Sequence, residues 1–162
     1  MFKLGLIGKH ISHSLSKRYF DAKFKNENIK NFQYDLYDID NLKQLNELII
    51  QNKIIGLNVT MPYKNEIIQT LDGLDKIALK TQSVNTIFVN PKTGLKKGFN
   101  TDFFGFERLL FKLHLKKNIK SLILGSGGVS STISYVLKKH DIKYKIVSRK
   151  PKNNMLHYQD LD

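Results

Sequence analysis

The chain has 162 residues, 41% of them hydrophobic, so it accommodates one domain, or one domain and part of a second, around a buried core. It contains no cysteine, which excludes disulfide bonds, a thiolate nucleophile and cysteine-ligated metal sites. The net charge of +13 comes mostly from scattered lysines (24 of 27 basic residues), and because no zinc spacing or aromatic-lined RNA-binding motif accompanies them, we expect neither a metal nor a nucleic-acid partner.

The first predicted element is a strand over the apolar run at residues 2–7, and a polar segment leads from it into a helix. The helix is indicated by the spacing of Phe20 and Phe24. Ser14 and Ser16 precede it, and hydroxyls beside the N–H groups of a helix terminus can bind a carboxylate or a phosphate. Serines at this place are also ordinary helix caps, so both interpretations stay open.

Strands then alternate with helices over most of residues 1–101. Leucines at helical spacing lie between the second and third predicted strands, at residues 42–49, and a Pro-Lys-Thr-Gly turn at residues 91–94 predicts a hairpin. The further predicted strands cover residues 32–37, 54–60, 84–89 and 95–99. This alternation favours an α/β sheet with helices on its faces.

A polar segment, Asn-Val-Thr-Met-Pro-Tyr-Lys at residues 58–64, closes the third predicted strand. Pro62 has a fixed φ and no N–H, so it stops the strand and turns the chain. Lys64 follows at the expected start of the next helix, where the positive helix terminus disfavours an ammonium unless an anion is nearby. Because open α/β sheets bind ligands at this edge, Lys64 is a candidate functional residue. A solvated lysine in a basic protein is the alternative.

A carboxylate stands at a comparable place further along the chain. Residues 98–102, Gly-Phe-Asn-Thr-Asp, follow the last predicted strand of this part and precede an apolar helix pattern over residues 103–113. Thr101 or Asp102 would serve as an ordinary cap of that helix, which is one interpretation of this segment. Lys64 and Asp102 together place one cation and one carboxylate at the ends of strands, which favours a site.

A glycine turn between a buried strand and a helix follows at residues 121–137. The sequence Gly-Ser-Gly-Gly-Val-Ser, residues 125–130, is close to the dinucleotide-binding pattern G-x-G-x-x-G/A, with Ser130 in the last small position. A second strand at residues 144–147 completes the β–α–β unit that this pattern requires. The sequence therefore predicts a nucleotide-binding segment.

Ser148, Arg149 and Lys150 follow that second strand, about 20 residues past the glycines. An NAD-binding site usually places an acidic residue there to hold the ribose hydroxyls, whereas an arginine can pair with the 2′-phosphate of NADP. These residues favour NADP over NAD, and a solvated basic turn is the alternative.

Five segments of the chain, taken in order, resemble the shikimate dehydrogenase family. They are HSLSK at residues 13–17, NVTMPYK at 58–64, SVNT at 83–86, GFNTDFFGF at 98–106 and GSGGVS at 125–130. The resemblance extends from Phe2 to about Lys150 and implies an N-terminal α/β substrate-binding domain followed by a partial Rossmann-type nucleotide-binding domain. It also implies the family's oxidoreductase activity, the reversible NADPH-dependent reduction of 3-dehydroshikimate to shikimate in chorismate and aromatic amino-acid biosynthesis.

The same resemblance implies roles for particular residues. Lys64 would be the catalytic acid/base, acting together with Asp102. Substrate contacts would come from Ser14, Ser16, Asn58, Thr60, Asn85 and Asp102. NADP would be bound by Gly125, Ser126, Gly127, Gly128, Val129, Ser148, Arg149 and Lys150.

We expect a substrate-binding catalytic domain over residues 1–101 and an incomplete NADP-binding domain over residues 102–162. Family members continue past the position of Asp162, so a C-terminally truncated chain is expected, and an inactive remnant that binds only shikimate-like acids is the alternative to an active enzyme. No apolar run is long enough to span a bilayer and no signal peptide is visible. We therefore expect a cytoplasmic monomer or homodimer with small-molecule partners.

Overall fold

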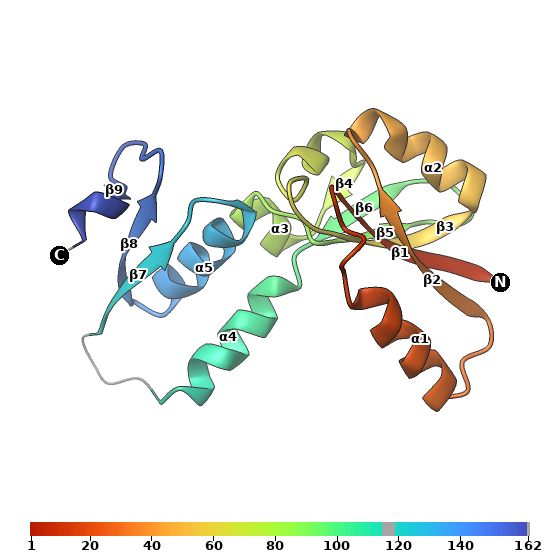
Figure 1. The fold of residues 1–162 in the computed structure, drawn as a ribbon, viewed down its shortest axis with the longest axis horizontal. Coiled ribbons are helices and arrows are strands. Elements are labelled where there is room, and N and C mark those ends of the chain that lie inside the picture. The colour runs from red at the N-terminus through yellow and green to blue at the C-terminus, as the bar shows by residue number, and fades with distance from the viewer. Residues whose placement is uncertain (115–118, 162) are drawn as a thin grey trace.

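The computed structural model describes residues 1–114 and 119–161, so Asp162, the last residue of the expected NADP-binding segment, lies outside it. The elements form two lobes (Figure 1). The first lobe contains β1 (Phe2–Gly8), α1 (Ser16–Asn26), β2 (Phe32–Asp38), α2 (Leu45–Asn52), β3 (Ile54–Val59), β4 (Gly73–Leu74), α3 (Lys76–Thr81), β5 (Thr86–Val89) and β6 (Lys96–Phe99). The second contains α4 (Asp102–Lys112), β7 (Lys120–Leu124), α5 (Gly128–Lys139), β8 (Lys143–Ser148) and β9 (Leu156–His157).

Within residues 1–114, six strands form one mixed sheet in the order β2-β1-β3-β5-β6-β4. β1 runs parallel to β2 and β3, whereas β5 runs antiparallel to β3 and β6. A hairpin at residues 91–94 joins β5 to β6, and Gly94 adopts a φ of +73° there, a left-handed conformation that glycine takes without strain. The predicted α/β class and the predicted hairpin are confirmed.

Side-chain alternation along the strands separates two apolar layers on the two faces of this sheet. Leu6 and Tyr34 pack with Phe20 of α1 in one cluster. Ile7 packs with Leu45 of α2 in the other, which is the larger one. Because successive side chains of a strand point to opposite faces, α1 covers one face and α2 covers the other.

The second lobe is built on three parallel strands within residues 119–161, in the order β7-β8-β9. α5 connects β7 to β8, and both α4 and α5 contribute to a core that contains Ile123, Val136 and Leu137. On either side of Ile123 along β7, Leu122 and Leu124 are 53% and 65% exposed. This part of the sheet is therefore covered by helices on one face and open on the other.

Sequence patterns did not predict β4, β9 or α3. β4 and β9 have two residues each, too few to produce an alternation signal. α3 is short as well, but its start carries a recognisable cap, because the side chain of Asp75 accepts a hydrogen bond from Ala78 N at 2.6 Å. That aspartate is the signal that could have identified the helix.

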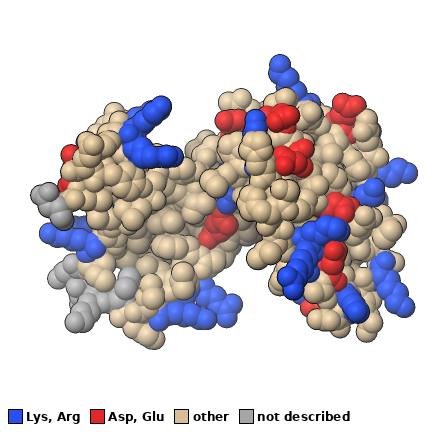
Figure 2. Space-filling view, in the orientation of Figure 1, with Lys and Arg blue, Asp and Glu red and all other residues tan. Residues whose placement is uncertain are grey.

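Lysine and arginine side chains are spread over both lobes on the face shown in Figure 2 and do not gather in one patch there. No helix in the described part of the chain is both long enough and apolar enough to cross a bilayer. Among residues 1–114 and 119–161, no three His, Asp or Glu side chains are grouped so that they could hold a metal ion.

Candidate active site at the junction of the lobes

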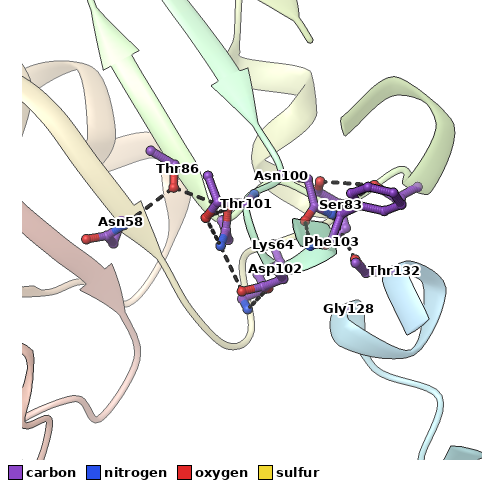
Figure 3. A network of polar contacts seen from close by, with 12 residues as sticks. Asn58, Lys64, Ser83, Thr86, Asn100, Thr101, Asp102, Phe103, Gly128 and Thr132 are labelled. Atoms are coloured by element: carbon purple, nitrogen blue, oxygen red, sulfur yellow. Dashed lines mark hydrogen bonds and ion pairs between the residues drawn. The ribbon is translucent and has the colours of Figure 1, made fainter. Parts of the chain in front are cut away.

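Lys64 and Asp102 come together where the two lobes meet (Figure 3), and Figure 2 shows a notch in the surface between those lobes. Lys64 Nζ donates a hydrogen bond to Asp102 Oδ2 at 2.7 Å, and the two side chains are 12% and 31% exposed. The structure thus joins the cation and the carboxylate of two separate sequence segments in one ion pair. Partial burial strengthens the attraction between their charges.

A turn over residues 61–65 carries Lys64 away from the end of β3. The peptide bond before Pro62 is cis, and the strand ends ahead of it, as expected from this proline. The carbonyl oxygen of Lys64 accepts a hydrogen bond from Val84 N at 2.7 Å, which anchors the turn to the segment before β5. A 3₁₀ helix, Glu66–Thr70, begins two residues after the lysine.

Asp102 is the first residue of α4, but neither its side chain nor that of Thr101 caps this helix. Asn100 takes that role, because its Oδ1 accepts a hydrogen bond from Phe103 N at 3.2 Å. The carboxylate of Asp102 is left to face Lys64. It also lies in the first turn of α4, where the positive end of the helix stabilises an anion.

Asn85 holds the ion pair from the other side. Its Nδ2 donates to Asp102 Oδ1 at 2.8 Å, and its Oδ1 accepts from Thr101 N at 2.8 Å. The main chain of Asn85 is fixed between two strands, since it accepts from Val59 N at 2.8 Å and donates to Phe99 O at 3.0 Å. Both carboxylate oxygens of Asp102 are therefore hydrogen-bonded, one to the ammonium and one to an amide.

Asn58 on β3 extends this polar network across the sheet. Its Nδ2 donates to Thr86 Oγ1 at 3.4 Å (Figure 3), and its Oδ1 accepts from the hydroxyl of Tyr34 at 2.8 Å. Thr86 and Tyr34 were not among the predicted site residues. Tyr34 lies outside the five motifs, in a strand whose pattern signals only core packing.

Ser14 and Ser16 lie at the start of α1, with their hydroxyl oxygens 3.2 Å apart. The N-cap residue is Leu15, which makes no side-chain cap, and Ser14 Oγ accepts from Ser16 N at 3.3 Å. The loop ahead of them is held by Asp38, whose two carboxylate oxygens accept from the backbone N–H groups of residues 10 and 11 at 2.9 and 3.1 Å. The two hydroxyls are thus presented together on a fixed loop.

Thr60 follows β3 at the same end of the sheet. Its backbone N–H donates to Ile7 O at 2.9 Å, and its methyl group lies against Gly8. A Cβ at Gly8 would be 2.5 Å from Thr60 Cγ2, so this approach of the two chain segments requires glycine.

The glycine turn of the second lobe lies directly against the turn that carries Lys64. A Cβ at Gly128 would be 3.0 Å from Lys64 Cβ and 2.7 Å from Asn65 Oδ1, so a larger residue there would require the side chains of this turn to shift. Gly125 has a φ of +109°, a conformation that also favours glycine. A cavity of about 190 Å³ is lined from both lobes, by Met61, Pro62 and Lys64 together with residues 123–125, residues 127–130 and Ile133.

The end of β8 lies beside this turn. Ser126 Oγ and Ser148 Oγ are 2.9 Å apart, and Ser148 Oγ also accepts from Lys150 N at 3.2 Å. Arg149 and Lys150 are exposed. The structure therefore brings the predicted cofactor residues of both strands to one edge of the sheet, with the basic side chains facing solvent.

A second polar contact between the lobes was not predicted. Asn100 is 1% exposed, and its Nδ2 donates to Thr81 Oγ1 of α3 at 2.9 Å and to Thr132 Oγ1 of α5 at 2.8 Å. With the cap on Phe103 N, this one side chain ties together three helices from both lobes (Figure 3). An asparagine between a strand and a helix is the signal that could have marked it.

Comparison with known proteins gives consistent matches, of which the relatives described below cover 93–99% of this chain. Residues 6–87 match the family described as the shikimate dehydrogenase substrate binding domain. The shikimate dehydrogenase (NADP(+)) of Clostridium beijerinckii is 37% identical over 155 residues, which cover 93% of this chain and 56% of that protein. The enzyme of the same name from Clostridium botulinum (strain Hall) is 39% identical over 166 residues, which cover 98% of this chain and 62% of that protein.

A solved structure shows the same architecture. The crystal structure of shikimate dehydrogenase 1 from Peptoclostridium difficile is similar with a TM-score of 0.89 and 30% sequence identity, over 99% of this chain and 62% of that one. The chain thus spans 56–62% of the length of these three relatives. An α/β substrate-binding domain followed by a partial nucleotide-binding fold, as predicted, is confirmed by this likeness.

Proposed function

This chain belongs to the shikimate dehydrogenase family, and on that premise we propose that it carries out the reversible, NADPH-dependent reduction of 3-dehydroshikimate to shikimate. The observation that carries the proposal is the Lys64–Asp102 ion pair, which lies against the glycine turn of the second lobe. A proton donor and a nucleotide-binding turn meet there, as the reduction of a ketone requires.

Lys64 is the proton donor in this proposal. Addition of hydride to a ketone builds negative charge on the carbonyl oxygen, and an ammonium within hydrogen-bond reach stabilises that charge and protonates the oxygen. Asp102 holds the ammonium in place, and Asn85 holds the carboxylate. In the reverse direction, the neutral amine of the lysine accepts the proton of the substrate hydroxyl.

The substrate would lie between the two serines and the ion pair. Hydroxyls of Ser14 and Ser16 hydrogen-bond its carboxylate at the start of α1, where the positive helix end favours an anion. The ring hydroxyls would be held by Thr60, Asn85 and Asp102, with Asn58 lining the same pocket. Several neutral hydrogen-bonding side chains surround one ion pair, and this arrangement suits a small acid that carries several hydroxyl groups.

The residues of the second lobe fit NADP. Gly127 precedes α5 without a side-chain cap, so the first N–H groups of the helix can hydrogen-bond a pyrophosphate. Arg149 and Lys150 are exposed beside the glycine turn and supply positive charge for a 2′-phosphate. The further candidates are Gly125, Ser126, Gly128, Val129 and Ser148. When bound, the reduced nicotinamide supplies the hydride for the ketone carbon.

The proposed division into a substrate-binding domain over residues 1–101 and an NADP-binding domain over residues 102–162 has support from the two separate sheets. Asp102 is then the first residue of the second segment, yet it is hydrogen-bonded to Lys64 and Asn85 of the first. The ion pair of the proposed active site is therefore formed by residues from both segments.

Shikimate binding by calorimetry, followed by shikimate-dependent reduction of NADP⁺, tests this function. We expect the chain to bind shikimate and the double variant Ser14→Ala/Ser16→Ala to lose most of that affinity. Turnover with NADP⁺ would support the full proposal. Shikimate binding without turnover would favour the alternative, a chain that retains only shikimate-like acid binding, and an absence of shikimate binding would overturn both.

The cofactor assignment has a separate test. Arg149→Ala should weaken the binding of NADP⁺ by about tenfold and leave that of NAD⁺ within about twofold, because only NADP⁺ carries the 2′-phosphate. Arg108→Ala, an exposed arginine of α4, is the matched control for the loss of one positive charge. An equal loss for both nucleotides would contradict the assignment.

A further inference from the structure

The polar network around Asp102 has a direction that follows from two groups with fixed hydrogen-bonding roles. A backbone N–H only donates, so the contact of 2.8 Å from Thr101 N identifies the side-chain oxygen of Asn85. An ionised carboxylate only accepts, so the contact of 2.8 Å to Asp102 identifies the side-chain nitrogen of Asn85. The amide orientation of Asn85 is therefore determined at both ends.

This orientation propagates back across the sheet. Because Asn85 Oδ1 is an acceptor, the hydroxyl of Thr86 at 3.2 Å donates to it. Thr86 Oγ1 then uses its lone pair to accept from Asn58 Nδ2, at 3.4 Å. The oxygen of the Asn58 amide is left pointing the other way, where it needs a donor.

The hydroxyl of Tyr34 is that donor, 2.8 Å from Asn58 Oδ1. Tyr34 is 2% exposed and its ring stacks on Phe20 of α1, with centroids 4.2 Å apart and planes 12° from parallel. Lys17 Nζ donates to the backbone oxygen of Tyr34 at 2.8 Å. Burial raises the pKa of Tyr34 to about 12, so at neutral pH the phenol keeps its proton.

We propose that Tyr34 is a positioning residue of this site, whose buried hydroxyl supplies the donor for Asn58 Oδ1 and so holds the Asn58 amide in the orientation that the chain of hydrogen bonds from Asn85 selects. The proposal rests on the proposed function for its consequence, which is that Asn58 presents its N–H groups to the substrate pocket, while Asn85 is already oriented by Thr101 N and Asp102. Without the hydroxyl, Asn58 Oδ1 loses its donor and the amide can rotate by half a turn. Its oxygen would then meet Thr86, and the donor side of the pocket would be disordered.

The strand that carries Tyr34 also provides a matched control. Tyr37 lies on the opposite face of β2, packed over Gly5, and its hydroxyl oxygen is buried with no hydrogen-bond partner among the described residues. Tyr34→Phe and Tyr37→Phe remove the same atom from the same strand. Tyr34→Phe removes a hydroxyl that belongs to the chain of hydrogen bonds. Tyr37→Phe removes a hydroxyl that has no hydrogen-bond partner among the described residues.

The test uses two readouts on the 162-residue chain. Side-chain amide signals of Asn58 and Asn85 in ¹⁵N NMR spectra of the ligand-free protein report amide orientation, and calorimetry reports the affinity for shikimate. We expect Tyr34→Phe to shift the side-chain amide signals of Asn58 more than those of Asn85, and to weaken shikimate binding by about three- to tenfold, which is the worth of one hydrogen bond. Tyr37→Phe should leave the amide signals unchanged and the affinity within about twofold.

Two variants of Thr86 locate the effect in the chain of hydrogen bonds. Thr86→Val removes the hydroxyl from the chain of hydrogen bonds and should reproduce the effect of Tyr34→Phe. Thr86→Ser keeps the hydroxyl and should retain the amide signals and the shikimate affinity of the unmodified protein. Unchanged Asn58 signals in Tyr34→Phe, or equal effects of the two tyrosine variants, would overturn the proposal. If the unmodified chain fails to bind shikimate, the proposed function fails, but the NMR comparison still decides the role of Tyr34.

Discussion

The two lobes hold their functional residues in different ways. In the first lobe, the site residues lie at one edge of a sheet that α1 and α2 cover on opposite faces. In the second lobe, the glycine turn joins a sheet with an open face, on which Leu122 and Leu124 are exposed. Lys64 and Asn85 thus have rigid support from the first lobe, whereas the glycine turn depends on what holds it against that lobe.

Two contacts, one between the lobes and one within the second lobe, compensate for this difference. Asn100 joins α3, α4 and α5 in a buried polar cluster. Within the second lobe, Glu107 of α4 accepts hydrogen bonds from Lys139 at 2.9 Å and from His140 at 2.7 Å at the end of α5. If this comparison is right, variants in the two lobes and at their junction should have separable effects.

The largest effect is expected at Lys64, the first-lobe member of the ion pair that joins the two lobes. Lys64→Ala should reduce turnover by about a thousandfold or more, because the developing charge on the carbonyl oxygen loses its stabilising donor. Shikimate affinity should change much less, since the other substrate contacts remain. Steady-state kinetics and calorimetry measure the two quantities, and Lys92→Ala in the exposed hairpin turn is the control. Comparable turnover in the Lys64 variant would remove this lysine from the mechanism.

A pair of core variants compares how much the hydrophobic core of each lobe contributes to the free energy of unfolding. Leu57→Ala, at a site 2% exposed in the first lobe, should lower the free energy of unfolding by about 4 kcal/mol. Leu137→Ala, at a site 3% exposed in the second lobe, should cost only about 2 to 3 kcal/mol because the half-covered sheet can relax into the space. Urea unfolding followed by circular dichroism gives both values. A larger loss in the Leu137 variant would reverse the comparison.

A junction variant should separate the lobes without emptying either core. Asn100→Ala leaves the amide of Phe103 and two buried threonine hydroxyls without this partner, at a cost of about 2 kcal/mol. Hydrogen exchange should accelerate in α5 more than in β1 or β3. Asn26→Ala at the exposed end of α1 serves as the control. Uniform acceleration in both lobes would mean that they unfold as one unit regardless of Asn100.

The smallest effect is expected at the contact between α4 and α5. Hydrogen bonds from Lys139 and His140 lower the pKa of Glu107 below its ordinary value of 4.5. A carboxyl with a lowered pKa stabilises the folded state above that ordinary value, and the contribution is lost as the pH falls through the folded-state pKa. The stability difference between the unmodified chain and Glu107→Gln, within about 1 kcal/mol, should therefore be present at pH 7 and shrink below pH 4.5. A difference that stays constant with pH would exclude the ionised contact.

Local signals in the sequence predicted most of the strands and the long helices. Alternating and helical spacings located β1, β2, β3, α4 and α5 to within a few residues, because each of these elements buries one side or one stripe. β4 and β9 were missed because two residues carry no periodic signal. Most candidate residues followed from five short motifs, in which polar side chains interrupt the ends of apolar runs. Ser148, Arg149 and Lys150 followed from their position about 20 residues past the glycines.

The sequence by itself determined which residue types stand at the ends of strands, and therefore that Lys64, Asp102 and the glycine turn are candidates. Only the tertiary structure decided how they meet, because hydrogen bonds between distant segments depend on sheet order and register. It made Asn100, in place of Thr101 or Asp102, the cap of α4, and it brought Tyr34 under Asn58, although 24 residues separate them in the chain. Neither arrangement leaves a periodic trace in the sequence, since a buried polar contact is specified by the position of its partner and not by its neighbours along the chain.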